Sequence, residues 1–164
     1  MVSTLNFIAV LCLASGLWIG ANAEYEDQCC DECKRCPSGW TEFDGHCYMY
    51  QHASKDWADA ELACVAKGGN LASVQRPNHH EFVRSLIHAA TNRNDQTWVG
   101  GFDTTKEGAW MWSDGSFFTS KNLWGPHQPD NAGRKEHCME VNFHGKPNDV
   151  PCNLKRPFVC GKAL

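Results

Sequence analysis

The chain has 164 residues, with 15 Lys and Arg against 19 Asp and Glu, and a formal net charge of -4. A mildly acidic chain without a basic run is poorly suited to nucleic acid or to an anionic membrane surface, because both attract clustered positive charge. Composition therefore argues against nucleic acid as a partner.

The N-terminal segment 1–23 carries no charged side chain and contains the apolar run 7–14. It ends in Ala21-Asn22-Ala23, the small-x-small pattern after which signal peptidase cuts. The apolar run is shorter than the ~20 residues of a membrane-spanning helix. We therefore predict a signal peptide over 1–23, a secreted extracellular protein without membrane insertion, and a mature chain of one domain beginning at Glu24.

Cysteine content is high, with 10 in the chain, of which Cys12 falls in the predicted signal. The others are Cys29, Cys30, Cys33, Cys36, Cys47, Cys64, Cys138, Cys152 and Cys160. In a secreted chain this density indicates disulfides. Because the mature chain has an odd number of cysteines, at least one thiol is free or bonded to another chain.

The first four of these cysteines crowd into Cys29-Cys30-x-x-Cys33-x-x-Cys36, a spacing that also occurs in metal sites. Secretion favours disulfides over zinc, and a redox motif at Cys30-x-x-Cys33 lacks the βαβ context. We predict a Cys-rich N-terminal segment over 24–35, with Cys29, Cys30 and Cys33 as candidates for a local cluster or for interchain bonds.

Next along the chain, Asp44-Gly45 predicts a hairpin turn between short aromatic strands, with Cys36 and Cys47 on either side. Ser54 predicts the N-cap of a helix over 54–67, which Gly68-Gly69 would end. Its expected buried face consists of Trp57, Ala58, Leu62, Val65 and Ala66.

A second helix is expected to open at Asn78, with Glu81 in an arrangement like a capping box. Its apolar stripe consists of Phe82, Val83, Leu86, Ile87 and Ala90. His79 and His80 fall in the first turn, where side chains are usually exposed, and no third ligand is evident. We therefore do not predict a metal there.

Strands are predicted over 97–102, 110–112, 138–143 and 158–160. The segment 116–137 follows neither the helical nor the strand period and contains Pro126 and Pro129. Such a long irregular stretch within a small domain is usually functional.

Oxygen-bearing side chains gather between 128 and 149. They are Gln128, Asp130, Glu136, Asn148 and Asp149. Carboxylate and amide oxygens suit Ca²⁺, which takes about six to eight of them. The alternative is a polar surface loop rich in turn-forming residues.

Taken together, the ordered motifs from Cys36 to Lys162 resemble a C-type lectin-like domain. They are the Cys36/Cys47 hairpin, the helix with Cys64, Trp98-Val99-Gly100-Gly101, Trp112-Ser113-Asp114-Gly115, Gln128-Pro129-Asp130, Glu136, Asn148-Asp149, Cys138, Cys152 and Cys160. The resemblance is to short secreted galactose-type lectins of fish plasma, mucus and venom.

The fold that this resemblance implies is α+β and covers 36–162. It has two helices, a small mixed or antiparallel sheet and a long calcium-binding loop. The implied disulfides are Cys36–Cys47, Cys64–Cys160 and Cys138–Cys152. A cis peptide bond is implied before Pro129.

For function, the resemblance implies that Gln128, Asp130, Glu136, Asn148 and Asp149 bind one Ca²⁺ and also contact a sugar. Two vicinal hydroxyls would complete the coordination sphere. In this family Gln-Pro-Asp generally accompanies galactose or N-acetylgalactosamine, whereas Glu-Pro-Asn accompanies mannose-type sugars. The implied partners are glycans that end in galactose or N-acetylgalactosamine.

The chain departs from the family pattern at two places. Galactose-selective members often have an aromatic residue after this motif, where this chain has Asn131-Ala132-Gly133. His127 or Trp124 would have to substitute, although Trp124 is expected in the core. Pro147 stands where the family usually has Trp, and it restricts Lys146 and removes a backbone donor.

Two other functions within this family compete with a galactose-binding lectin. One is a calcium-dependent antifreeze protein, although those relatives carry further cysteines that are absent around Phe102-Asp103-Thr104 and His137-Cys138. The other is a venom-type domain that binds proteins, which often lacks some of the calcium ligands. An enzyme is not expected, because no Gly-x-Ser-x-Gly motif and no cofactor loop occur. A lectin of this kind would need multivalency, for which a disulfide-linked homodimer or oligomer would serve.

Overall fold

The computed structural model describes residues 35–164, so the predicted signal peptide and Cys29, Cys30 and Cys33 lie outside the described residues. The elements in chain order are β1 (Thr41–Phe43), β2 (His46–Lys55), α2 (Trp57–Val65), β3 (Asn70–Leu71), α3 (Pro77–Thr91), β4 (Thr97–Phe102), β5 (Met111–Trp112), the 3₁₀ turn η1 (Ala132–Arg134), β6 (Cys138–Phe143), β7 (Lys146–Val150) and β8 (Arg156–Ala163). The predicted α+β fold is confirmed.

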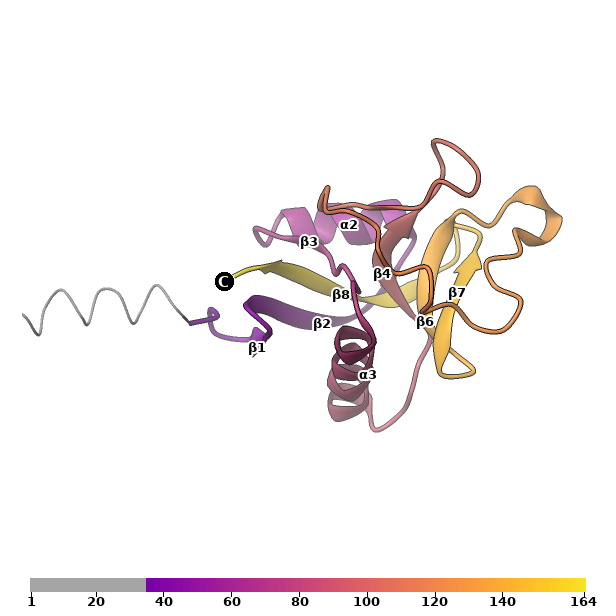
Figure 1. Cartoon of the computed structure of the whole chain (residues 1–164). Helices are drawn as coiled ribbons and strands as arrows, with labels where there is room; N and C mark the ends of the chain where they lie inside the picture. Colours follow the sequence, from indigo (N-terminus) through magenta and orange to yellow (C-terminus); the bar gives the residue numbers. More distant parts are fainter. Residues whose placement is uncertain (1–34) are drawn as a thin grey trace, which may run out of the picture. The chain divides into compact units, whose positions relative to one another are not determined.

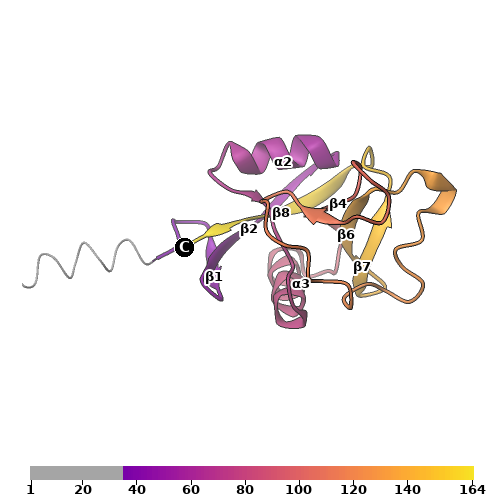
Figure 2. The same ribbon diagram turned by 45° about the horizontal axis from the view of Figure 1, so that its top comes forward.

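The sheet is mixed and runs in the order β1-β2-β8-β4-β6-β7. The C-terminal strand β8 pairs antiparallel with β2 and parallel with β4. It therefore lies between the β1–β2 hairpin and the strands β4, β6 and β7. The helices α2 and α3 lie on opposite sides of this sheet, and the β6–β7 hairpin lies at the end away from β1 (Figures 1 and 2). The long irregular segment before β6 lies at this far end as well (Figure 1).

The predicted first hairpin is confirmed. Asp44 and Gly45 have φ values of 51° and 74°, so both central residues of the turn are left-handed, as a two-residue turn between twisted strands requires. Phe43 pairs with His46 directly across it. The Cys36–Cys47 disulfide fastens the hairpin to the chain that precedes it.

Helix α2 differs from its prediction in both start and buried face. Ser54 and Lys55 remain in β2, and Asp56 is the N-cap, accepting a hydrogen bond from the Asp59 backbone N–H. Ala60 and Cys64 are buried, whereas Leu62 and Val65 are 66% and 52% exposed. The predicted face is therefore wrong for Leu62 and Val65, although Trp57 packs against the core as expected. The Cys64–Cys160 bond turns the Cys64 side of the helix toward β8.

Helix α3 begins at Pro77, one residue before the predicted Asn78, and no side chain caps its start. Proline is favoured at this first position because the N–H that it lacks has no partner within the helix. The helix ends at Thr91. Its C-cap Asn92 has a left-handed φ of 55° and donates its backbone N–H to the His88 carbonyl. Val83 and Ile87 are buried as predicted, but Ala90 is exposed.

His79 and His80 in the first turn of α3 are 3% and 2% exposed, so their predicted exposure is wrong. The β1–β2 hairpin covers the start of the helix, where His79 Nε2 lies 2.7 Å from the Asp44 carboxylate. Among the described residues, neither histidine belongs to a cluster with the geometry of a metal site.

Buried residues and disulfides join segments of the domain that are far apart in the sequence. Trp98 is fully buried and donates its indole N–H to the Lys55 carbonyl. The three disulfides implied by the family resemblance are present, and Cys138–Cys152 ties β6 to the segment after β7. No helix of residues 35–164 is long and apolar enough to cross a membrane.

Candidate functional site

Three of the five predicted calcium ligands meet at the far end of the sheet. Carboxylate oxygens of Asp130, Glu136 and Asp149 lie within 4.8 Å of one another, and we call these three residues the acidic cage. Asp149 comes from β7, while Asp130 and Glu136 come from the long loop after the cis peptide bond between Gln128 and Pro129. Residues 19 positions apart in the sequence are thereby brought to one spot.

Backbone donors from the loop hold two of the cage carboxylates in place. Asp149 accepts hydrogen bonds from the N–H groups of Asp130 at 3.2 Å and Asn131 at 2.8 Å. Glu136 accepts one from the Ala132 N–H at 2.8 Å. Asn131 makes this possible because its left-handed backbone, with φ of 44°, turns the chain sharply after the motif.

Two of the cage carboxylates have raised pKa values. Burial raises the pKa of Asp149, to which the like charge of Asp130 also contributes. Burial raises the pKa of Glu136 too, and the negative charges of Asp149 and Asp130 act in the same direction. Crowded carboxylates with raised pKa values are stabilised in their ionised form by a cation.

The two predicted amide ligands adjoin cage residues in the chain, Gln128 two positions before Asp130 and Asn148 directly before Asp149, and each has an unsatisfied oxygen. Gln128 Oε1 and Asn148 Oδ1 are buried and have no hydrogen-bond partner. An orphaned buried acceptor costs about 1–3 kcal/mol, so its presence calls for an explanation. Two such oxygens next to three carboxylates fit a hard cation such as Ca²⁺, because all five side chains then have a partner.

Glu140, which the sequence analysis did not single out, fixes the orientation of Asn148. The Asn148 amide N–H points to Glu140 Oε1 at 3.4 Å, and the other oxygen of Glu140 accepts from Arg156 Nε at 2.8 Å. Because only the nitrogen of an amide donates, this contact leaves the oxygen of Asn148 as its free acceptor. The sequence signal was a carboxylate between the apolar residues Met139 and Val141 of the predicted strand.

Pro147 is accommodated because β7 is the edge strand of the sheet. Asn148 and Asp149 pair with Glu140 and Met139, and the register shift lies between Glu140 and Phe143. Proline is tolerated at an edge, where a missing N–H need not break a ladder. The Pro147 carbonyl accepts a hydrogen bond from Gly125, which joins β7 to the loop that carries Gln128.

A second group of candidate ligands, also missed in the sequence, consists of Asp103, Glu107 and His137. His137 Nδ1 lies 3.0 Å from Asp103 and 3.5 Å from Glu107. Asn131 also donates to Glu107. These polar atoms are engaged with one another, so this group shows no unsatisfied atom comparable to those of Gln128 and Asn148. Residues so far apart give no local sequence signal.

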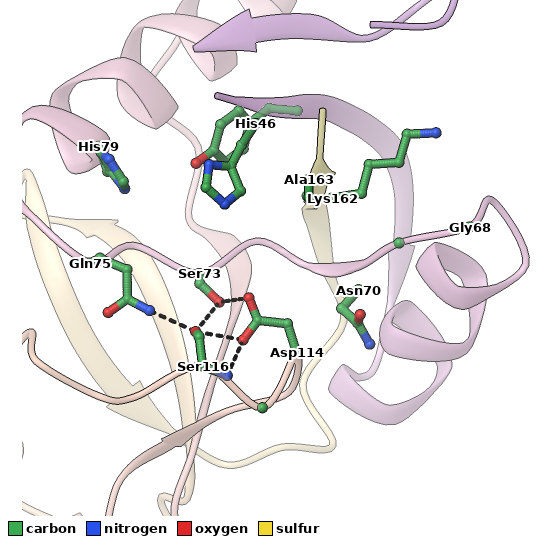
Figure 3. A pocket seen from close by; sticks show the side chains of 14 residues that line it. His46, Gly68, Asn70, Ser73, Gln75, His79, Asp114, Ser116, Lys162 and Ala163 are labelled. Atoms are coloured by element: carbon green, nitrogen blue, oxygen red, sulfur yellow. Dashed lines mark hydrogen bonds between the residues drawn. The ribbon is translucent and has the colours of Figure 1, made fainter. Parts of the chain in front are cut away.

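A cavity of about 510 Å³ lies away from the cage and shares none of its residues. Ser73, Gln75, Asp114 and Ser116 on one side of it are hydrogen-bonded to one another (Figure 3). Because these groups already have partners, we place the candidate site at the cage rather than in this cavity.

Beside the cage is a cavity of about 490 Å³ with a more apolar lining. Gln128 and Pro129 form one side of it, and Trp110, Phe118 and Trp124 supply aromatic rings. Trp124, expected in the core, packs against the core but remains partly exposed. Aromatic surface is therefore present next to the Gln-Pro-Asp motif, although on the side that precedes it in the sequence.

Comparison with known proteins places the chain in a family. The family described as Lectin C-type domain matches residues 53–162. The galactose-specific lectin nattectin of Thalassophryne nattereri is 44% identical over 165 residues, which cover 100% of both chains. The lactose-binding lectin l-2 of Anguilla japonica is 37% identical over 76% of each chain.

Solved structures agree with these relatives. Human lithostathine superimposes with a TM-score of 0.72 at 33% identity, covering 79% of this chain and 92% of that one. Herring type II antifreeze protein gives a TM-score of 0.71 at 30% identity, covering 79% of this chain and 99% of that one. The motif order, the fold and the relatives agree, and the chain belongs to the C-type lectin domain family.

Proposed function

We propose that the protein is a secreted calcium-dependent lectin selective for terminal galactose or N-acetylgalactosamine. In this proposal the signal peptide 1–23 is removed and the lectin domain spans 36–162. The observation that carries the proposal is the pair of unsatisfied oxygens on Gln128 and Asn148 beside the acidic cage. The relatives named for galactose and lactose binding support the sugar class.

The five side chains Gln128, Asp130, Glu136, Asn148 and Asp149 would hold the ion through their oxygens. When bound, Ca²⁺ would supply open coordination positions for two vicinal sugar hydroxyls. The carboxylates of the site accept hydrogen bonds from these hydroxyls, and the amide N–H groups of Gln128 and Asn148 donate to them. Binding, not catalysis, is the activity that this arrangement serves.

The order of amide and carboxylate in the motif would set the sugar preference. Gln128 places a donor on one side of Pro129, and Asp130 places an acceptor on the other. Exchanging them reverses the hydrogen-bond polarity that the two hydroxyls meet. The double substitution Gln128→Glu with Asp130→Asn should therefore weaken galactose binding and favour mannose.

The test is retention of the purified protein on immobilised galactose in Ca²⁺, with elution by EDTA, galactose or mannose. We expect release by EDTA and galactose but not by mannose, and the reverse sugar preference for the double variant. Asp59→Asn, a charge change on the outside of α2, is the control and should behave as the unmodified protein. Calcium binding without retention on any sugar would refute the lectin proposal.

Antifreeze activity is the second candidate, because the fold superimposes on herring type II antifreeze protein over nearly all of that chain. Thermal hysteresis in the calcium-loaded protein, combined with no galactose retention, would favour this function. A protein-binding role of the venom type is the remaining alternative. Loss of sugar binding and of hysteresis, with calcium binding intact, would point to it.

A further inference from the structure

The aromatic cavity beside the cage is formed by side chains that are only partly buried. Trp110 and Trp124 meet edge to face with ring centroids 4.6 Å apart. Phe118 lies 6.3 Å from the first and 6.4 Å from the second. Three large rings that line an open cavity of about 490 Å³ leave apolar surface facing water, which is unfavourable without a ligand.

The position of this cavity restricts what it can bind. Gln128 and Pro129 line it, and Gln128 is also one of the five residues proposed to hold the ion. A ligand that extends from the cage past Gln128 and Pro129 would reach the cavity. Lys121 is the only charged residue among those that line it, so the cavity is mainly apolar.

We propose that Trp110, Phe118 and Trp124 form a second subsite, which binds a flat apolar group linked to the galactose. The ligand class is a galactoside whose aglycone, or whose adjoining sugar ring, presents an apolar face to the aromatic rings. This inference rests on the proposed galactose function.

The probes are methyl and phenyl galactosides, compared once as a pair of α anomers and once as a pair of β anomers. Calorimetry in Ca²⁺ measures the binding of each compound. A ring contact of this kind predicts that the phenyl compound binds about 2- to 12-fold more tightly than the methyl compound in at least one configuration. The ratio of the two dissociation constants is the readout, because changes at the cage affect both compounds alike.

Ala109→Phe tests the subsite by filling the cavity from its wall, without altering any proposed calcium ligand. It should reduce the phenyl-to-methyl ratio to about one while methyl galactoside binding remains. Phe118→Ala should lower the ratio as well, although it also removes a stacked contact with Trp112 at 5.0 Å. Phe117→Ala is the matched control, because this neighbouring ring is 89% exposed and does not line the cavity.

The outcomes separate the two proposals. Methyl galactoside binding with equal affinity for the phenyl compound would overturn the subsite and leave the lectin function standing. An unchanged ratio in Ala109→Phe would also overturn it. Binding of neither compound, with calcium affinity intact, would overturn the galactose function and the subsite with it.

Discussion

Among single residues, Glu140 contacts a predicted ligand of the candidate site without being one of the ligands itself. Its side chain is 1% exposed, and its charge is balanced by Arg156. One oxygen holds the Asn148 amide so that Oδ1 remains available to a cation. Residues that orient a metal ligand commonly matter almost as much as the ligand itself.

We predict that Glu140→Gln weakens calcium binding about 10- to 100-fold, because a neutral amide can turn either its oxygen or its nitrogen toward Asn148. Loss of the partner of Arg156 should also lower the free energy of unfolding. Calorimetry with Ca²⁺ measures the first effect and urea unfolding the second. Glu81→Gln is the control, because Glu81 pairs with Arg84 on the surface. Unchanged calcium affinity in folded Glu140→Gln would show that Asn148 is oriented by something else.

His80 is a second residue whose environment predicts a measurable effect. Burial lowers its pKa from 6.5 to about 4. The negative charge of Glu81 raises the pKa, whereas the positive charges of Arg84 and Lys146 lower it further. The unfolded chain therefore binds more protons than the folded protein between these two pH values. The stabilisation is complete above pH 6.5 and is lost as the pH falls toward 4.

The expected loss from His80 is about 2 kcal/mol in the free energy of unfolding between pH 7 and pH 5. His80→Phe keeps a ring in the same place but does not titrate, so its stability should fall less over this range. Urea unfolding at both pH values gives the free energy of unfolding of the variant and of the unmodified protein. Contributions from the cage are the same in both proteins and cancel in the difference. The exposed His88→Phe serves as the control. Equal pH dependence in His80→Phe and the unmodified protein would contradict the assignment.

At the scale of elements, α2 shows why its orientation was not predicted from its own residues. Apolar and small residues occur on more than one side of this helix, so spacing alone did not identify the buried face. The Cys64–Cys160 bond and the packing of Trp57 decide it, and both depend on distant strands. A pattern that is ambiguous locally is resolved by a tertiary contact.

This orientation predicts that two substitutions in α2 change the free energy of unfolding by very different amounts. Ala60→Leu adds volume to a fully buried position and should cost about 1–3 kcal/mol of unfolding free energy. Leu62→Ala removes a side chain that is 66% exposed and should change stability by less than about 0.5 kcal/mol. Urea unfolding of both variants is the measurement. A larger loss for Leu62→Ala would restore the face expected from the sequence.

Other elements were predicted well because their signals are local. The Asp44-Gly45 turn, the alternating strand 138–143 and the buried strand 97–102 agree with β1–β2, β6 and β4. The starts of both helices differ from the prediction. Ser54 lies in β2, which pairs with β8, whereas Asn78 lies in the first turn of α3 because Pro77 takes its first position. The oxygen-bearing residues of the candidate site were predicted from their type and order, and the structure brings three of their carboxylates together. The roles of Asn131 and Glu140 were not predicted, since they depend on contacts across the β6–β7 hairpin and the loop.

At the scale of the whole molecule, cysteine pairing bears on valency. Six cysteines of the described residues form three disulfides within the chain. If the signal peptide is removed, Cys29, Cys30 and Cys33 are the cysteines that remain. Three thiols cannot all pair within one chain. An interchain bond would join two lectin domains, and linked sites bind clustered glycans more tightly than single sites do.

We therefore predict that the secreted protein migrates as a dimer or larger oligomer without reducing agent and as a monomer with it. Replacing Cys29, Cys30 and Cys33 together by Ser should yield a monomer that still binds a soluble galactoside with the same affinity, because the proposed sugar site lies within 128–149. The same variant should lose agglutination of galactose-bearing cells, since one site per molecule cannot bridge two surfaces. Electrophoresis, calorimetry and agglutination measure the three properties separately. A monomer that agglutinates as strongly as the unmodified protein would show that multivalency arises from non-covalent assembly instead.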